Sequence, residues 1–199
     1  MAENKRFIKE KNVVKKATKL APLYIAETET EVIKLDIGCG KTTPEGWIGV
    51  DSLDFGQKHI LDIRKGLPYA DNSISEVRSS HFVEHLTGTE RIGFFNELYR
   101  VMKVGATAQI ITPHWSNTCA YGDPTHQWPP MSEWYAFYLN KAWRDTQAPH
   151  AAYTCDFDYV IAGSWDQRLV GRNPEYTQIS MNTQINAWRD LIVTITKRA

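Results

Sequence analysis

Histidines and carboxylates gather in two short segments near the middle of the chain, HFVEH at residues 81–85 and YGDPTHQW at residues 121–128. With the histidine between these segments, the candidates for chemistry are His81, Glu84, His85, His114, Asp123 and His126. Positioned imidazole and carboxylate groups act as general acids and bases, and both also bind metal ions. The residue types therefore allow either acid–base catalysis or a metal site.

HFVEH fits H-x-x-E-H, the inverted zinc peptidase motif, in which two histidines one helical turn apart bind zinc and the glutamate activates water. Such an enzyme needs a third ligand, and Glu133 and Glu175 lie in segments that give little support to that role. The strand series around the motif is also unlike a peptidase. We therefore expect no metal site, and we expect Glu84 and His85 to orient the following helix through an ion pair with Arg100.

A glycine-containing turn lies in LDIGCGKTTPEGWIGVD, residues 35–51. Gly38-Cys39-Gly40 lacks bulky side chains, so a ligand can approach its backbone closely. Three strand-like runs, EVIKLDIG, WIGVD and HILDI, close on or near Asp36, Asp51 and Asp62. In a parallel α/β sheet, ligands bind beyond the carboxyl ends of the strands, where these aspartates would gather. The turn and the aspartates together predict a nucleotide-like ligand.

Two common phosphate-binding patterns do not fit this turn. A dinucleotide fold has G-x-G-x-x-G followed by a helix, whereas the third glycine is absent here and Pro44 and Gly46 interrupt the segment. Asp51 follows Asp36 by only fifteen residues, too few for two strands and a crossover helix of about 10 residues. The Walker pattern fails because no glycine stands five residues before Gly40. Pyrophosphate binding is therefore not favoured.

The remaining elements predict a layered α/β sheet. Thr87 and Glu90 have the spacing of a capping box, and apolar residues at helical spacing lead to Met102, with Gly105 suited to the helix end. Residues 76–79, 106–112, 157–165 and 187–196 are typical of strands, and a helix is expected from Ser132 onward. We expect the last two strands to be joined by a polar, hairpin-like stretch around residues 171–182.

LDIGCG, the acids that end the next two strands, and SSHFVEHL...ELYRVMKVGA...IITP resemble the class I S-adenosylmethionine-dependent methyltransferases. The resemblance runs from about Val32 to Pro113 and is strongest to the small bacterial and phage type with a shortened first crossover. It implies a Rossmann-like fold with a mostly parallel seven-stranded sheet and an antiparallel final strand. One departure is Val104-Gly105-Ala106, where the family usually has Pro-Gly-Gly.

The resemblance also implies which residues bind S-adenosylmethionine. Asp36, Gly38 and Gly40 would line the methionine part of the cofactor. Asp51 would bind the ribose hydroxyls, because an ionised carboxylate only accepts hydrogen bonds and can take two hydroxyl donors. The last expected contacts are Asp62 near the adenine amino group and Ser80 or His81 beside the sulfonium.

Methyl transfer from a sulfonium needs alignment above all, and a base only where the acceptor loses a proton. We expect His81, His114 and His126 to lie at the acceptor site, with His126 or His81 as the base. Trp115, Asp123 and Trp128 are the expected acceptor contacts, since aromatic rings can stack on a sugar or planar ring. Helical spacing favours core packing for several of the aromatic residues between 134 and 143.

The acceptor is expected to be a small-molecule or carbohydrate oxygen. The tetrapeptide Ser79-Ser80-His81-Phe82 stands where amino-methylating DNA enzymes have (Asp/Asn/Ser)-Pro-Pro-aromatic, and no cysteine follows a proline as in cytosine C5 enzymes. Equal numbers of basic and acidic residues, 23 each, give no global field for nucleic acid. A nucleotide or nucleic-acid acceptor and a non-catalytic nucleoside-binding module remain the alternatives.

We expect residues 1–199 to form a single domain, with a basic arm at residues 1–20 that would carry any polyanion contact, and an acceptor-site lid at residues 113–147. No apolar run approaches the ~20 residues that span a bilayer, and MAENKRFIKEKN is unlike a secretory signal. Cys39, Cys119 and Cys155 are odd in number and widely spaced, which favours reduced thiols. A cytoplasmic protein without a membrane partner is the expectation.

Overall fold

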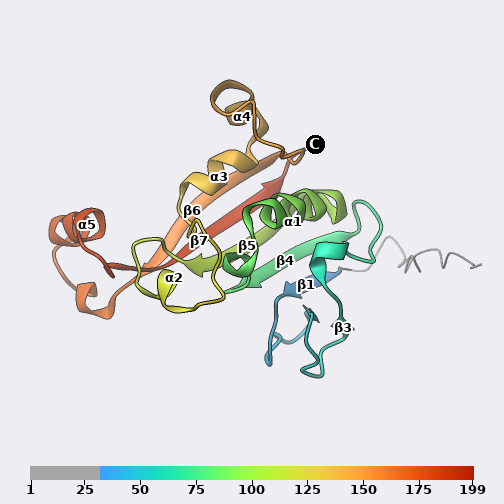
Figure 1. The fold of residues 1–199 in the computed structure, drawn as a ribbon, viewed down its shortest axis with the longest axis horizontal. Coiled ribbons are helices and arrows are strands. Elements are labelled where there is room, and N and C mark those ends of the chain that lie inside the picture. The colour runs from blue at the N-terminus through green and yellow to red at the C-terminus, as the bar shows by residue number, and fades with distance from the viewer. Residues whose placement is uncertain (1–31) are drawn as a thin grey trace, which may run out of the picture.

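A seven-stranded sheet in the order β3-β2-β1-β4-β5-β7-β6 forms the centre of the computed structural model, which describes residues 32–199 (Figure 1). The strands are β1 (Lys34–Ile37), β2 (Ile48–Asp51), β3 (His59–Ile60), β4 (Ile74–Ser80), β5 (Met102–Pro113), β6 (Phe157–Trp165) and β7 (Trp188–Lys197). β1 to β5 pair in parallel, and β7 is antiparallel to both β5 and β6. The predicted fold class is confirmed. The predicted basic arm lies outside the described residues.

The connections at the β1–β3 edge are short. Residues 38–47 join β1 to β2 and residues 52–58 join β2 to β3, both through turns and irregular backbone without an α-helix. Only a 3₁₀ turn, η1 (Ile63–Lys65), follows β3. The spacing between Asp36 and Asp51 had excluded a crossover helix, and the structure confirms that the first crossover is shortened. The turn after β1 therefore lies directly beside the end of β2.

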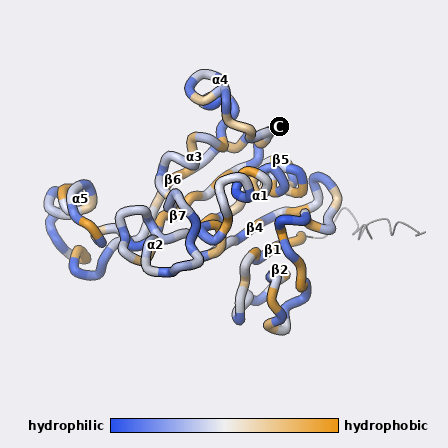
Figure 2. Tube along the Cα trace, in the orientation of Figure 1, coloured by the Kyte–Doolittle hydropathy of each residue, from blue (hydrophilic) through white to orange (hydrophobic). Residues whose placement is uncertain are grey.

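The helix α1 (Gly88–Val101) connects β4 to β5 and lies across one face of the sheet (Figure 1). The predicted capping box is present: the Thr87 side chain accepts the Glu90 N–H, and the Glu90 carboxylate accepts the Thr87 N–H. Along α1 the hydropathy alternates (Figure 2), and its apolar side buries Phe95 and Leu98 in the core. α1 thus fixes the end of β4 against the sheet.

The predicted end of this helix is wrong. Met102 pairs with Ile74 and begins β5 directly after Val101, so Gly105 lies inside the strand with a φ of 79° rather than after a helix. Hydrogen bonding to β4 begins at Met102, before the point where the sequence pattern places the end of the helix. The Lys197 ammonium also donates to the Met102 carbonyl, at 3.0 Å.

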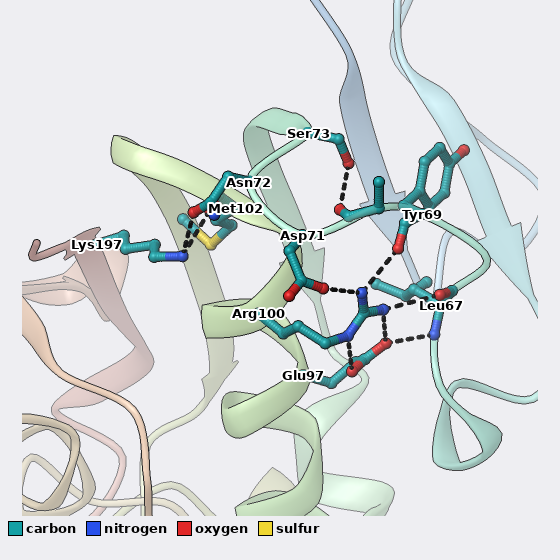
Figure 3. A network of polar contacts seen from close by, with 10 residues as sticks. Leu67, Tyr69, Asp71, Asn72, Ser73, Glu97, Arg100, Met102 and Lys197 are labelled. Atoms are coloured by element: carbon teal, nitrogen blue, oxygen red, sulfur yellow. Dashed lines mark hydrogen bonds and ion pairs between the residues drawn. The ribbon is translucent and has the colours of Figure 1, made fainter. Parts of the chain in front are cut away.

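The predicted ion pair between Arg100 and Glu84 or His85 does not form in the described part of the chain. The Arg100 guanidinium donates to the Glu97 carboxylate at 2.6 and 2.9 Å and to Asp71 at 2.7 Å (Figure 3). The same side chain donates to two carbonyls of the loop before β4. Arg100 lies near the C-terminal end of α1, whereas Glu84 and His85 precede its first turn, so the helix itself separates them. Arg100 therefore fastens the loop before β4 to α1.

The second half of the chain adds short helices beside and beyond β5 and β6. They are α2 (Cys119–Gly122), α3 (Trp134–Leu139), α4 (Lys141–Gln147), η3 (Gln167–Leu169) and α5 (Pro174–Thr183). In the first half, the 3₁₀ turn η2 (Val83–His85) precedes α1. No helix within residues 32–199 is long and apolar enough to cross a membrane. Cys39 and Cys155 are buried free thiols, and Cys119 is exposed.

The hairpin-like stretch expected between the last two strands contains α5 instead, which projects away from the sheet (Figure 1). Asn173 caps this helix by accepting the Glu175 N–H, and Pro174 occupies its first turn, where a missing N–H costs nothing. The sequence contains these helix-start signals, but the polar composition of the segment favoured a loop. β6 and β7 are therefore joined by an excursion rather than a tight turn.

Candidate functional site

The glycine turn after β1 holds its two glycines in different surroundings. Gly38 has a φ of 69°, and a Cβ placed there would lie 2.5 Å from the Cβ of Phe82. Gly40 has a φ of 56°, and a Cβ there would meet nothing within 4 Å. Both positions favour glycine because L-residues rarely adopt this backbone conformation. Gly38 is thus closed by packing, while Gly40 faces open space.

Asp51 at the end of β2 is held by two backbone amides. The Gly40 N–H donates to Oδ2 at 3.0 Å and the Leu53 N–H donates to Oδ1 at 3.0 Å. A carboxylate oxygen accepts more than one hydrogen bond, so each oxygen keeps acceptor capacity. The turn after β1 therefore orients a partly exposed carboxylate that can take two further donors.

Asp36 in β1 is fully buried, and its partner is on the neighbouring strand. Arg78 in β4 donates to Oδ1 at 2.7 Å, while Oδ2 has no hydrogen-bond partner among the described residues. Burial raises the pKa of Asp36, although the hydrogen bond and charge of Arg78 oppose the rise. An unsatisfied buried carboxylate oxygen is costly, and a bound donor would remove that cost.

Asp62 and Ser80 complete the set of expected cofactor contacts. Asp62 caps η1 and binds the Arg64 guanidinium through both oxygens, at 2.8 and 3.0 Å. These hydrogen bonds hold the pKa of Asp62 below its usual range. Asp62 follows β3, whose Ile60 pairs with Asp51, and Ser80 ends β4 beside Ile111. Asp51 and Ser80 thus end their strands, Asp36 lies one residue before the end of β1, and Asp62 lies two residues after β3, so all are at or near the carboxyl ends of β1 to β4.

These residues fit S-adenosylmethionine. The unpaired Asp36 oxygen suits the positively charged amino group of a methionine moiety. Gly40 leaves room for a ligand, and Asp51 offers two aligned acceptors for a ribose diol. Asp62 is the weakest match, because Arg64 already occupies both of its oxygens.

A cavity of about 730 Å³ opens beyond the ends of β4 and β5. The histidines and carboxylates at this cavity come from three parts of the chain and are His81, Glu84, His85, Asp123, His126 and Asp190. Three of the predicted site residues, His81, Asp123 and His126, are therefore brought together.

His81 stands directly after β4 with a φ of 54° and a half-exposed side chain. Its Nδ1 lies 3.4 Å from Glu84 Oε1, and its Nε2 lies 3.6 Å from Asp190 Oδ1. The neighbouring Glu84 carboxylate is the main cause that raises the pKa of His81, and burial opposes it. The imidazole is thus held between two acids at the cavity wall.

His114 lies elsewhere. It is buried, with Nδ1 2.7 Å from Ser116 Oγ and Nε2 3.0 Å from Glu133 Oε1, and it stacks on Trp188. The hydrogen bond from His114 lowers the pKa of Glu133. Both ring nitrogens are engaged and the residue borders a different cavity, so the structure does not bring His114 together with His81 and His126.

The expected acceptor contacts are divided between two cavities. Trp115 and Trp128 line a second cavity of about 640 Å³, where the Trp128 side chain is 78% exposed. Asp123 lines the first cavity and accepts both the N–H and the hydroxyl of Thr125. Within the predicted lid, seven of the residues from Pro113 to His126 line the first cavity, whereas α3 packs against β6.

Sequence reasoning missed Arg189 and Asp190 at the first cavity. They lie in β7, which enters the sheet between β5 and β6 and places Asp190 opposite Pro113. No local motif marks them, since strand insertion alone brings them to the site.

No protein-family model and no curated protein sequence matches the chain. Among solved structures, a SAM-dependent methyltransferase from Archaeoglobus fulgidus is 21% identical with a TM-score of 0.57, covering 83% of this chain and 86% of that chain. The [4+2]-cyclase SpnF is 14% identical with a TM-score of 0.50, covering 84% of this chain and 76% of that chain. The chain therefore has the Rossmann-like fold of the class I S-adenosylmethionine-dependent methyltransferases.

Proposed function

We propose that the chain is an S-adenosylmethionine-dependent methyltransferase that acts on a hydroxyl oxygen of a small molecule or carbohydrate. The observation that carries this proposal is the position of Phe82. Its side chain packs on Gly38 of the cofactor turn, and its neighbour His81 lines the 730 Å³ cavity. One residue step therefore links the expected cofactor site to a cavity rich in acids and bases.

For the cofactor, the proposed roles are those that the resemblance to the class I methyltransferases implies. Asp51 binds the ribose hydroxyls, and Asp36 with Gly40 holds the methionine part. Asp62 lies toward the adenine, and Ser80 beside the sulfonium. When bound, S-adenosylmethionine supplies a methyl group on a positively charged sulfur that leaves as a neutral thioether.

We assign His81 as the general base of the reaction. A hydroxyl acceptor must lose a proton as its oxygen bonds to carbon, and a positioned imidazole can take it. Glu84 and Asp190 flank the two ring nitrogens and stabilise the imidazolium that results. His126 lines the same cavity and is the second acceptor-site histidine.

The aromatic surface supports the acceptor class. Trp115, Tyr121, Trp128 and Trp134 are exposed around the second cavity. Exposed indole and phenol rings offer flat apolar faces with polar edges, which suit a sugar or a planar ring. Trp115 follows His114 directly after β5, the strand whose end borders the first cavity. We propose that an elongated acceptor extends from the first cavity over these rings.

The fold alone does not assign methyl transfer, because the similar structure SpnF is a [4+2]-cyclase. The test is to incubate the full chain with methyl-labelled S-adenosylmethionine and pools of glycans, hydroxylated metabolites or nucleic acid. Label in the metabolite or glycan pool, with release of the demethylated product, is the expected result. Label only in nucleic acid would refute the proposed acceptor. Tight cofactor binding without demethylated product in any pool would favour a nucleoside-binding module.

A further inference from the structure

Glu84, His85 and His126 stand together in a cluster that the proposed reaction does not require as a group. One ligand atom of each residue lies within 4.8 Å of the others, at the wall of the 730 Å³ cavity. We propose that these three side chains bind a divalent transition-metal ion.

The Glu84 carboxylate is the strongest reason. The residue is 4% exposed, and neither carboxylate oxygen has a hydrogen-bond partner among residues 32–199. Its one ion pair within residues 32–199 is with His81, whose Nδ1 lies 3.4 Å from Oε1. Burying an ionised carboxylate without hydrogen bonds is costly unless a cation compensates it. A metal ion at the cavity wall supplies that charge and leaves Oε1 beside His81.

Hydrogen bonds at Nδ1 leave the Nε2 lone pair of both histidines available for a metal ion. His126 Nδ1 lies 3.2 Å from the Ala120 carbonyl, which only accepts, so Nδ1 carries the proton. The Thr125 hydroxyl gives its single proton to Asp123 Oδ1 at 2.7 Å, so its oxygen accepts from His85 Nδ1 at 2.9 Å. In both rings the lone pair remains on Nε2. Such hydrogen bonds at the far nitrogen are typical of metal-binding histidines.

Main-chain contacts hold the two ligand-bearing segments together. The Gln127 N–H donates to the Glu84 carbonyl at 2.8 Å. Buried Arg91 donates to the carbonyls of Glu84 at 3.3 Å and Gln127 at 3.0 Å. The rings of His85 and His126 meet edge to face with centroids 4.8 Å apart. The site is therefore fixed by backbone contacts that exist without the ion.

Two imidazoles and one carboxylate favour zinc, manganese, iron or cobalt over calcium or magnesium. Around a tetrahedral ion with bonds of about 2.1 Å, ligand atoms lie roughly 3.4 Å apart, so the present spacing closes by small side-chain rotations. With three protein ligands, the ion would keep at least one coordination position open toward the cavity. There the ion would bind the acceptor oxygen and lower the pKa of its hydroxyl, a role that rests on the proposed function.

This arrangement differs from the H-x-x-E-H pattern, which pairs His81 with His85. Residues 83–85 form only a 3₁₀ turn, and His81 precedes it with a positive φ, so the two histidines do not share a helix face. The distant His126 takes the place of the first histidine, and Glu84 serves as a ligand rather than as a base.

The test is metal binding by the full chain after treatment with a chelator, followed by titration with Co²⁺ and Mn²⁺. Co²⁺ bound by imidazole and carboxylate gives visible absorption bands, and calorimetry gives the affinity. We expect one ion per chain, with more than about 10-fold weaker binding in His126→Ala, His85→Ala and Glu84→Gln. His150→Ala, which removes an exposed histidine, is the matched control and should bind normally.

Circular dichroism of each variant identifies any loss of fold, and the His126→Gln variant serves if His126→Ala unfolds. Unchanged affinity in all folded ligand variants, or equal weakening in His150→Ala, would overturn the site. S-adenosylmethionine titrations separate this result from the proposed function. Asp51→Ala should keep the metal and lose the cofactor, whereas His126→Ala should lose the metal and keep the cofactor.

Discussion

The Gly40 N–H donates to Asp51 Oδ2 at 3.0 Å, which joins the turn after β1 to the end of β2. The Leu53 N–H holds the other oxygen, so the carboxylate cannot rotate freely. This contact makes the glycine turn and the expected ribose site one unit. A change at Asp51 should therefore affect cofactor binding more than a change at any neighbouring acid.

Asp51→Ala should abolish S-adenosylmethionine binding in calorimetry, because it removes both acceptors for the ribose hydroxyls. Asp51→Asn should bind weakly, since its amide group would face a backbone N–H of Gly40 or Leu53. The matched control is Asp54→Ala, which removes an exposed carboxylate from the same loop. Normal affinity in Asp51→Ala would count heavily against the cofactor assignment.

Gly38→Ala should destabilise the fold more than Gly40→Ala. Both substitutions place a side chain at positive φ, at a cost of about 1–2 kcal/mol. Only the alanine at position 38 meets Phe82, and overpacking adds roughly 1–3 kcal/mol. Urea unfolding measures both changes. The double variant Gly38→Ala with Phe82→Gly removes the whole Phe82 side chain, including the Cβ that would lie 2.5 Å from the new methyl group, and should recover part of the added loss. Strict additivity would show that Phe82 is not the cause.

Glu97→Gln should lower the free energy of unfolding by about 1–3 kcal/mol at pH 7, because it weakens charged hydrogen bonds with Arg100 (Figure 3). Burial alone would raise the pKa of Glu97, but Arg100 and the Leu67 N–H together hold it below its usual range. A depressed folded-state pKa contributes stability above the unfolded pKa, and that stability is lost as the pH falls through the folded value.

The difference in the free energy of unfolding between wild type and Glu97→Gln should therefore become smaller as the pH falls below about 4.5. Urea midpoints at several pH values check this expectation. Glu45→Gln, at an exposed glutamate, provides the baseline and should show no such difference. A difference that is constant between neutral and acid pH would exclude the ionised carboxylate as its source.

Arg91→Lys should weaken the link between residues 83–84 and residues 127–129. Arg91 is buried and donates to four carbonyls, which a lysine with three donors on one atom cannot reach together. We expect the free energy of unfolding to fall by about 1–3 kcal/mol. Co²⁺ binding should also weaken, because His126 is no longer held against His85. Thermal unfolding and Co²⁺ titration measure these effects. Arg168→Lys, at an exposed arginine, should change neither.

The fold was predictable where its signals are local. Strand runs that end at or next to Asp36 and Asp51, and the capping box at Thr87, specify their elements through a few adjacent residues. The prediction that the helix ends at Gly105 was wrong because pairing between β4 and β5 begins at Met102. Tertiary pairing of this kind leaves no trace in a short window of sequence.

Part of the membership of the candidate site was predictable, but its geometry was not. His81 and His126 were expected near the acceptor, yet nothing in the sequence relates His126 to Glu84 or Asp190 to His81. These contacts depend on the Gln127–Glu84 hydrogen bond and on the insertion of β7 between β5 and β6. The same insertion places Asp190 opposite Pro113 at the cavity.

β7 follows β6 in the chain but lies between β5 and β6 in the sheet. During synthesis on the ribosome, β7 is therefore the last strand to be made. The cavity wall that carries Arg189 and Asp190 cannot form until every other strand has been made. A nascent chain that stops before β7 would already hold the glycine turn and the strand-end aspartates, yet it would have no finished chamber for an acceptor. Under the proposed function, a chain released before β7 would keep the residues expected to bind the cofactor and lack the cavity proposed for the acceptor.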